Sequence, residues 1–180
     1  ACRPSHTMRR LRCCNTAYPY KHFYTTNIMT TGDRLPELLG YDQNGNEITL
    51  SQMQGKKFIL YTYPKDNTPG CTAEACSLRD SYADLQAAGY AVIGVGKDSA
   101  ASHQRFAEKH ALPFPLIADV DTRLLQEIVA WGEKTMCGRK TVGTLRTTFL
   151  VDEEGRIERI FSPKEIKTKI HAAQILETIG

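Results

Sequence analysis

The sequence contains no pair of cysteines separated by two residues, and none of its apolar runs approaches the length of a membrane-spanning helix. The missing Cys-x-x-Cys spacing argues against a zinc ribbon and against a thioredoxin-type dithiol. Six cysteines in 180 residues do not indicate a secreted disulfide framework either, because such frameworks occur in small, cysteine-dense domains that lack a core. A chain of this length and apolar content is expected to bury one sizeable core.

Cys71 lies where a predicted strand gives way to a predicted helix. Residues 57–63 form a short aromatic and β-branched run, which is typical of a buried strand, and two prolines and Gly70 then interrupt it. After Cys71 the chain has no proline or glycine until Gly89, and apolar residues recur at helical spacing. Cys71 is therefore predicted in the first turn of a helix, where free N–H groups and the helix dipole favour a thiolate.

The alternative interpretation of Cys71 is a small buried hydrophobic residue, which is what most free cysteines are. Its neighbours favour reactivity instead, because Thr68 carries a hydroxyl that can bond a substrate oxygen and Gly70 allows the backbone to come close. A metal site at Cys71 and Cys76 would need His or Cys partners at a recognisable spacing, and the sequence offers none. We therefore expect neither a metal nor another cofactor.

The run Pro64-x-x-x-Thr68-x-x-Cys71 resembles the active-site signature of peroxiredoxins. The longer string over residues 63–76 is similar to the branch called peroxiredoxin Q or bacterioferritin comigratory protein, and the similarity covers roughly residues 29–180. Further matching segments are residues 32–36, 91–95, 131–134, 146–152 and 171–176. The resemblance implies a thiol-dependent peroxidase that reduces hydrogen peroxide and organic hydroperoxides in antioxidant defence and cell redox homeostasis.

The resemblance also implies a role for each residue of the site. Cys71 is the expected nucleophile toward the weak O–O bond, Thr68 is expected to orient the peroxide, and Pro64 is expected to shield the sulfur while ending the strand. Arg146 matches the arginine that pairs with the thiolate and the peroxide. From its place at a predicted buried strand alone, a structural salt bridge with an acidic side chain is an equally good interpretation of Arg146.

Cys76 lies at the offset of the family's resolving cysteine, although a buried helix cysteine remains an alternative interpretation. The resemblance implies that a Cys71 sulfenic acid condenses with Cys76 into an intramolecular disulfide, which thioredoxin or a similar thiol reductant then reduces. Cys137 stands where relatives usually carry tyrosine, so a second resolving cysteine is an open alternative. We expect a monomer that binds neither nucleic acid nor a membrane.

Other conspicuous side chains receive structural interpretations. Glu74 is explained by the dipole of the helix that begins near Cys71 and is given no catalytic role. His103 and His110 are expected on the surface of a polar helix, and Trp131 is expected to fill a hydrophobic gap.

Two other functions use the same cysteine. A redox sensor or holdase would use an oxidisable Cys71 to switch partners, and steady-state peroxide consumption with a thioredoxin system separates that function from a peroxidase. A disulfide oxidoreductase is disfavoured by the missing Cys-x-x-Cys spacing.

The order of predicted elements favours an α/β protein. Besides the strand and helix around Cys71, we predict strands near 91–95, 116–118, 147–151 and 156–161, helices near 100–110, 121–129 and 164–179, a turn at 44–45 and a looser segment over 131–145. Alternating strands and helices imply parallel pairing, and the last two strands are close enough for a hairpin. The expected architecture is a mixed central sheet flanked by helices, which matches the thioredoxin-like fold that the resemblance implies.

Residues 1–32 contain no Asp or Glu but five of the 23 basic residues, which leaves 18 basic against 20 acidic residues in the rest. That main part shows no sign of a nucleic-acid surface. Residues 1–28 are predicted to be a basic leader that is disordered and dispensable for catalysis, either a transit peptide or, as we favour, non-native residues before a start at Met29. Residues 29–180 are predicted to form the peroxiredoxin domain, in a cytoplasmic protein unless the leader targets it to a mitochondrion or plastid.

Overall fold

The computed structural model describes residues 28–136 and 139–180. Its strands are β1 (Leu38–Tyr41), β2 (Glu47–Thr49), β3 (Lys57–Thr62), β4 (Tyr90–Gly96), β5 (Leu116–Ala118), β6 (Trp131–Met136), β7 (Arg139–Thr144), β8 (Thr147–Val151) and β9 (Ile157–Phe161). Its helices are α1 (Leu50–Met53), α2 (Pro69–Asp80), α3 (Tyr82–Ala87), α4 (Ala100–His110), α5 (Arg123–Glu127) and α6 (His171–Ile179), with a 3-10 turn at Thr168–Ile170. Within these residues, no helix is both long and apolar enough to cross a membrane.

The central sheet has five strands in the order β5-β4-β3-β8-β9. Strands β3, β4 and β5 run parallel, because helices connect them, whereas β8 is antiparallel to both β3 and β9. This arrangement confirms the predicted mixed α/β sheet and the predicted hairpin at its end. It also places β3, the strand before Cys71, in the middle of the sheet.

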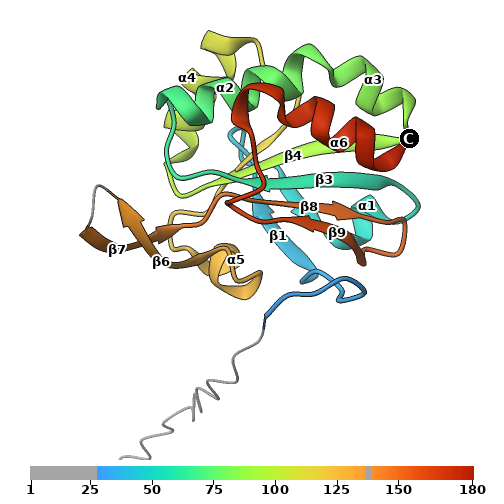
Figure 1. Ribbon diagram of the computed structural model, residues 1–180, viewed down its shortest axis with the longest axis horizontal. Helices are drawn as coiled ribbons and strands as arrows, with labels where there is room; N and C mark the ends of the chain where they lie inside the picture. The colour runs from blue at the N-terminus through green and yellow to red at the C-terminus, as the bar shows by residue number, and fades with distance from the viewer. Residues whose placement is uncertain (1–27, 137–138) are drawn as a thin grey trace, which may run out of the picture.

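Alternating side chains of β3 separate the core into two layers. Ile59 and Tyr61 point into the layer under α2, α3, α4 and α6, whereas Phe58 and Leu60 point into the layer that holds α1, α5 and β1. In Figure 1, α2, α3 and α6 lie together above the sheet and α5 lies below it. Helices therefore cover both faces, as predicted, and α2 begins at the edge where β3 ends.

The segment predicted to be loose, residues 131–145, is instead a β-hairpin of β6 and β7 (Figure 1). The prediction was wrong because the segment's glycines suggested irregular backbone. Gly132 and Gly143 in fact pair directly across the hairpin and extend it rather than break it. Cys137 lies outside the described residues, so its predicted alternative role as a resolving cysteine stays a prediction.

Two predicted helices are shorter than expected, and one early region was not predicted. Of the helix predicted over 121–129, only α5 is helical in the structure. Of the helix predicted over 164–179, the structure has a 3-10 turn followed by α6. The amide of Gln174 folds back to bond the backbone of Glu165 and Lys167, which satisfies polar groups that a longer helix would have paired internally. The short elements β1, β2 and α1 were missed, although the predicted turn at 44–45 does join β1 to β2.

Candidate active site

Cys71 is the third residue of α2, in the first turn of the helix as predicted. Pro69 occupies the first position, where a missing N–H costs nothing and the fixed φ favours the helix. The Cys71 side chain is almost fully buried, with 1% of its surface exposed. The N-terminal end of α2 therefore presents its partial positive charge to a sulfur shielded from bulk solvent.

Arg146, which directly precedes β8, reaches the sulfur. Its Nη2 donates to Cys71 Sγ at 3.2 Å, and its Nη1 donates to a Glu74 carboxylate oxygen. Such a guanidinium stabilises a negative sulfur more strongly than it would in water, because only 17% of the Arg146 side chain is exposed. Arg146 thus contacts the Cys71 sulfur and also forms a salt bridge with an acidic side chain, so the structure combines the two interpretations that the sequence left open.

The pairing of β3 with β8 explains how two residues 75 positions apart meet. Thr62, at the end of β3, pairs with Thr147, which follows Arg146 directly. The Thr62 hydroxyl donates to the Leu145 carbonyl at 2.6 Å and accepts from the Thr147 N–H at 3.0 Å. The backbone on both sides of Arg146 is therefore fixed to the strand that leads to Cys71.

Glu74 is the residue whose role the sequence did not reveal. A helix-dipole explanation would suit an exposed carboxylate, but Glu74 is fully buried and paired with Arg146. Burial raises the pKa of Glu74 to about 7, and the positive charge of Arg146 limits the rise. The signal was present in the spacing, because residues three apart on a helix share a face, so a cation that faces Cys71 also faces Glu74.

Thr68 and Pro64 lie in the loop between β3 and α2. Thr68 is the residue before the helix, and its hydroxyl donates to the Lys65 carbonyl at 3.1 Å, which leaves its oxygen lone pairs to accept a hydrogen bond. Pro64 follows β3 closely and is partly buried, consistent with ending the strand. Gly70 lies beside the arginine, since a Cβ placed on it would come 3.5 Å from Arg146 Nη2.

Cys76 lies farther along α2 and is partly buried, and it and Cys71 are both free thiols. Residues five apart on a helix are separated by a rise of about 7.5 Å, which exceeds the roughly 7 Å between Cα atoms that a disulfide tolerates. The helical form of this segment is therefore incompatible with a Cys71–Cys76 bond.

A buried polar cluster holds the loop before Cys71, and it corrects the expectation for His103. This histidine is fully buried on α4, not exposed, and its Nδ1 lies 2.9 Å from Asp66 and 3.2 Å from the Tyr63 hydroxyl. The Ser102 hydroxyl donates to the same Asp66 oxygen, Oδ2, at 2.7 Å. Because Asp66 lies in the loop, these bonds fix the loop to α4. His110, by contrast, is half-buried.

Lys134 on β6 adds a second positive charge near the sulfur. Burial and the neighbouring cations lower the pKa of this lysine, while Cys71 acts to raise it. The Lys134 ammonium donates to the Thr144 carbonyl at 3.2 Å.

Trp131 lies at the start of the same strand. As predicted, it packs against the hydrophobic core, in the layer that holds α1, α5 and β1, and the Lys97 ammonium lies 5.8 Å from the centroid of its ring.

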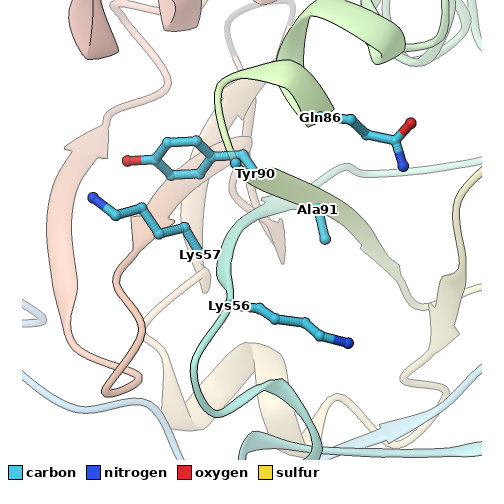
Figure 2. Close-up of a pocket in the computed structure, with 6 residues that line it drawn as sticks. Lys56, Lys57, Gln86, Tyr90 and Ala91 are labelled. Carbon is cyan, nitrogen blue, oxygen red and sulfur yellow. The ribbon is translucent and has the colours of Figure 1, made fainter.

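A small hollow of about 180 Å³ lies at the other end of β3 and β4, lined by Lys56, Lys57, Gln86, Gly89, Tyr90 and Ala91. In Figure 2 the Lys57 and Tyr90 side chains point to one side, and the Lys56 and Gln86 side chains point to the opposite side. Its polar groups do not converge on one point, so the hollow is no match for the site at Cys71. In the described part of the chain, no three His, Cys, Asp or Glu residues are placed to hold a metal ion.

Comparisons with known proteins agree with this geometry. The sequence profile of the AhpC/TSA family matches residues 31–160, which include both Cys71 and Arg146. The chain is 42% identical over 145 residues to the putative peroxiredoxin bcp of Coxiella burnetii, covering 81% of this chain and 95% of that protein. It is a peroxiredoxin of the AhpC/TSA family.

Further relatives place this peroxiredoxin in the Bcp, or peroxiredoxin Q, branch. The chain is 39% identical over 150 residues to the peroxiredoxin Bcp of Escherichia coli, covering 83% of this chain and 95% of that one. A solved structure of the bacterioferritin comigratory protein of Xanthomonas campestris has a TM-score of 0.74 at 31% identity, covering 83% and 97% of the two chains. These similarities confirm the thioredoxin-like fold and a peroxidase activity for the enzyme.

Proposed function

We propose that this peroxiredoxin reduces hydrogen peroxide and organic hydroperoxides through a Cys71 sulfenic acid and a Cys71–Cys76 disulfide, which thioredoxin or a similar thiol reductant recycles. The observation that carries the proposal is the contact between Arg146 Nη2 and the buried Cys71 Sγ at 3.2 Å. A guanidinium at this distance, together with the start of α2, supports a thiolate within a protected site.

The first step is a displacement at oxygen. The Cys71 thiolate attacks the terminal oxygen of the hydroperoxide, an S–O bond forms, the O–O bond breaks, and the departing oxygen leaves as water or an alcohol after taking a proton. Arg146 is placed to balance the negative charge that moves from sulfur to the departing oxygen. Thr68 is placed to accept the hydrogen of the peroxide's O–H group, since its own hydrogen is used on Lys65.

The second step forms the disulfide. The Cys76 sulfur attacks the Cys71 sulfur, the S–O bond breaks, and the hydroxyl leaves as water after taking a proton. Because the helical spacing exceeds the reach of a disulfide, the first turns of α2 must unwind for this step. The unwound segment would be accessible to a thiol reductant, whose thiolate attacks one sulfur of the disulfide and restores the two thiols through a mixed disulfide.

The breadth of substrates rests on a relative. The solved structures of the Xanthomonas campestris protein concern its alkyl peroxide reduction activity, in trapped intermediate and ligand complexes. We extend that activity to this chain because its fold and its signature residues are similar.

The test combines turnover with disulfide mapping. Purified protein with a thioredoxin system should consume hydrogen peroxide and cumene hydroperoxide steadily, Cys71→Ser should consume neither, and Cys76→Ser should consume one equivalent and then stall. After one equivalent of peroxide, mass spectrometry should find Cys71 joined to Cys76, and amide exchange should rise at the start of α2. A Cys71–Cys137 bond with α2 still protected would overturn the resolution step. Oxidation without repeated turnover would favour the sensor function instead.

A further inference from the structure

The peptide group between Lys65 and Asp66 lies in the loop before Cys71 and is hydrogen-bonded on both sides. Its N–H, which belongs to Asp66, donates to the Asp98 carboxylate at 2.8 Å. Its carbonyl, which belongs to Lys65, accepts from the Thr68 hydroxyl at 3.1 Å. Because a peptide group is planar and rigid, the bond to Asp98 fixes the direction in which the carbonyl meets the Thr68 hydroxyl.

The Asp66 side chain also holds this peptide group. Only 6% of Asp66 is exposed. Its carboxylate accepts from the Tyr63 hydroxyl at 2.9 Å and from the Ser102 hydroxyl at 2.7 Å, and His103 Nδ1 lies 2.9 Å from it. Rotation of the peptide group would leave some of these buried groups without a partner, which is costly, so the bonds of Asp66 oppose such a rotation.

Asn67 makes the turn that leads from this peptide group into Thr68. Its φ is 56°, in the left-handed region, which asparagine tolerates better than most residues. The Lys109 ammonium, on α4, donates to the Asn67 side chain at 3.3 Å. A backbone conformation of this kind persists where the surrounding contacts hold it, so the direction of the chain at Thr68 depends on the contacts of the loop with α4 and with Asp98.

Thr68 connects this loop to the reacting sulfur. Its carbonyl accepts from the Thr72 N–H at 2.9 Å, a bond of the first turn of α2, which contains Cys71. Its hydroxyl gives its hydrogen to the Lys65 carbonyl, so the peptide group sets the direction in which the oxygen lone pairs point. In the first step proposed above, these lone pairs accept the hydrogen of the peroxide.

We propose that Asp98 is a positioning residue for peroxide binding, which acts through the peptide group of Lys65 and Asp66 on the orientation of the Thr68 hydroxyl. This inference rests on the proposed role of Thr68. Asp98 takes no part in the bond changes at Cys71, where the S–O bond forms and the O–O bond breaks as described above.

The test compares variants of Asp98, which is half-buried between β4 and α4. Asp98→Ala removes the acceptor for the Asp66 N–H, whereas Asp98→Asn keeps a side-chain oxygen that can accept from it. The control is Asp152→Ala. Asp152 is also half-buried and accepts backbone N–H groups, those of Glu154 and Arg156, but in the turn between β8 and β9 at the other end of the sheet.

Each substitution is made in the wild type and in Thr68→Val, which removes the hydroxyl and keeps a side chain of similar shape. Reduced protein is mixed with hydrogen peroxide in a quenched-flow instrument, the remaining Cys71 thiol is alkylated, and mass spectrometry gives the second-order rate constant of its oxidation. Urea unfolding gives the stability of every protein, so that a loss of rate is separated from a loss of fold.

We expect Asp98→Ala to slow the oxidation of Cys71 about tenfold in the wild type, because a misdirected hydroxyl no longer aligns the peroxide. In Thr68→Val the same substitution should slow it less than about twofold, since the group on which Asp98 acts is already absent. Asp98→Asn should stay within about twofold of the wild type. Asp152→Ala should leave the rate unchanged, even where it lowers stability as much as Asp98→Ala does.

Contrary outcomes separate the two proposals. An equal loss from Asp98→Ala in both backgrounds would mean that Asp98 acts on the loop as a whole and would overturn the inference, as would a wild-type rate for Asp98→Ala or a loss as large for Asp98→Asn. A wild-type rate for Thr68→Val alone would instead overturn the proposed role of Thr68. Failure of the wild-type protein to oxidise Cys71 would overturn the proposed peroxidase mechanism itself.

Discussion

The two ends of the central sheet carry similar ion pairs in different surroundings. At the end where β3 leads to α2, the Arg146–Glu74 pair leaves 17% and 0% of its side chains exposed, and Arg146 also contacts Cys71. At the opposite end, Lys57 and Glu158 pair at 3.1 Å with 31% and 35% exposed, beside the hollow of Figure 2. Solvent weakens the second pair and hardly reaches the first, so burial rather than charge distinguishes the reactive end.

The largest effect should come from Arg146→Lys, which keeps the charge but removes the two-pronged geometry. A lysine cannot donate to Cys71 and Glu74 in the same fixed arrangement. We expect peroxide reduction to slow about a thousandfold, with an unchanged fold. Stopped-flow peroxide consumption measures the rate, and circular dichroism checks the fold. An unchanged rate would make Arg146 a structural ion-pair residue.

The next effect concerns His171, which is buried against Thr148 at 2.9 Å. Burial lowers the pKa of His171 from 6.5 to about 4, so the unfolded chain binds this proton more readily than the folded protein. Stability is therefore complete above about pH 6.5 and is lost as the pH falls toward 4, by about 3 kcal/mol. Urea unfolding across this range should show the loss.

The control for His171 is a matched histidine substitution. His171→Gln should flatten the acid limb of the stability profile, whereas His110→Gln should leave it nearly as steep, because His110 is only half-buried. Equal flattening by both substitutions would contradict the assignment to His171.

A smaller effect is expected from Glu74→Gln. The neutral amide can still accept from Arg146 but no longer holds it by charge, so we expect peroxide reduction to slow about tenfold. The rate of peroxide reduction by the wild type should also change near pH 7, where Glu74 titrates, and this change should be absent from the variant. Glu158→Gln is the matched control at the other end of the sheet, and a tenfold loss there would contradict the contrast between the two ends.

The smallest effect is expected from Lys57→Gln. Its partner Glu158 is about one-third exposed, and ion pairs of this kind contribute roughly 0–1 kcal/mol to stability. Peroxide reduction should be unchanged, because the pair lies at the far end of β3. High salt should remove whatever stability difference is measured, whereas the Arg146–Glu74 pair should resist it.

Local sequence patterns predicted the central fold well. Aromatic and β-branched runs identified β3, β4 and β8, and the place of Cys71 in the first turn of α2 followed from prolines, glycines and helical spacing. The β6–β7 hairpin escaped prediction because cross-strand pairing, not local composition, holds Gly132 opposite Gly143. Short elements such as β1 contain too few residues for the apolar periodicity of a strand or a helix to be recognised.

The site was predicted less completely. Cys71 has a local signal, whereas the partners of Glu74 and His103 depend on which strands and helices lie side by side. Both residues look like ordinary members of polar helices in the sequence, and both are fully buried. Burial of a single polar residue is decided by tertiary packing, so the bond between His103 and Asp66 could not be predicted from spacing. The bond between Glu74 and Arg146 follows from helical spacing only once Arg146 is known to face Cys71.

The pairing of β3 with β8 also has a consequence for folding. Cys71 and Arg146 are 75 positions apart and meet only when Thr62 and Thr147 are paired. Contacts of such high sequence separation form slowly, because the intervening chain must first be closed into a loop. In a nascent or unfolded chain, Cys71 is not yet in contact with Arg146. Rapid reaction of Cys71 with peroxide should therefore appear only when this long-range pairing is complete, and the rate of that reaction can be used to follow refolding.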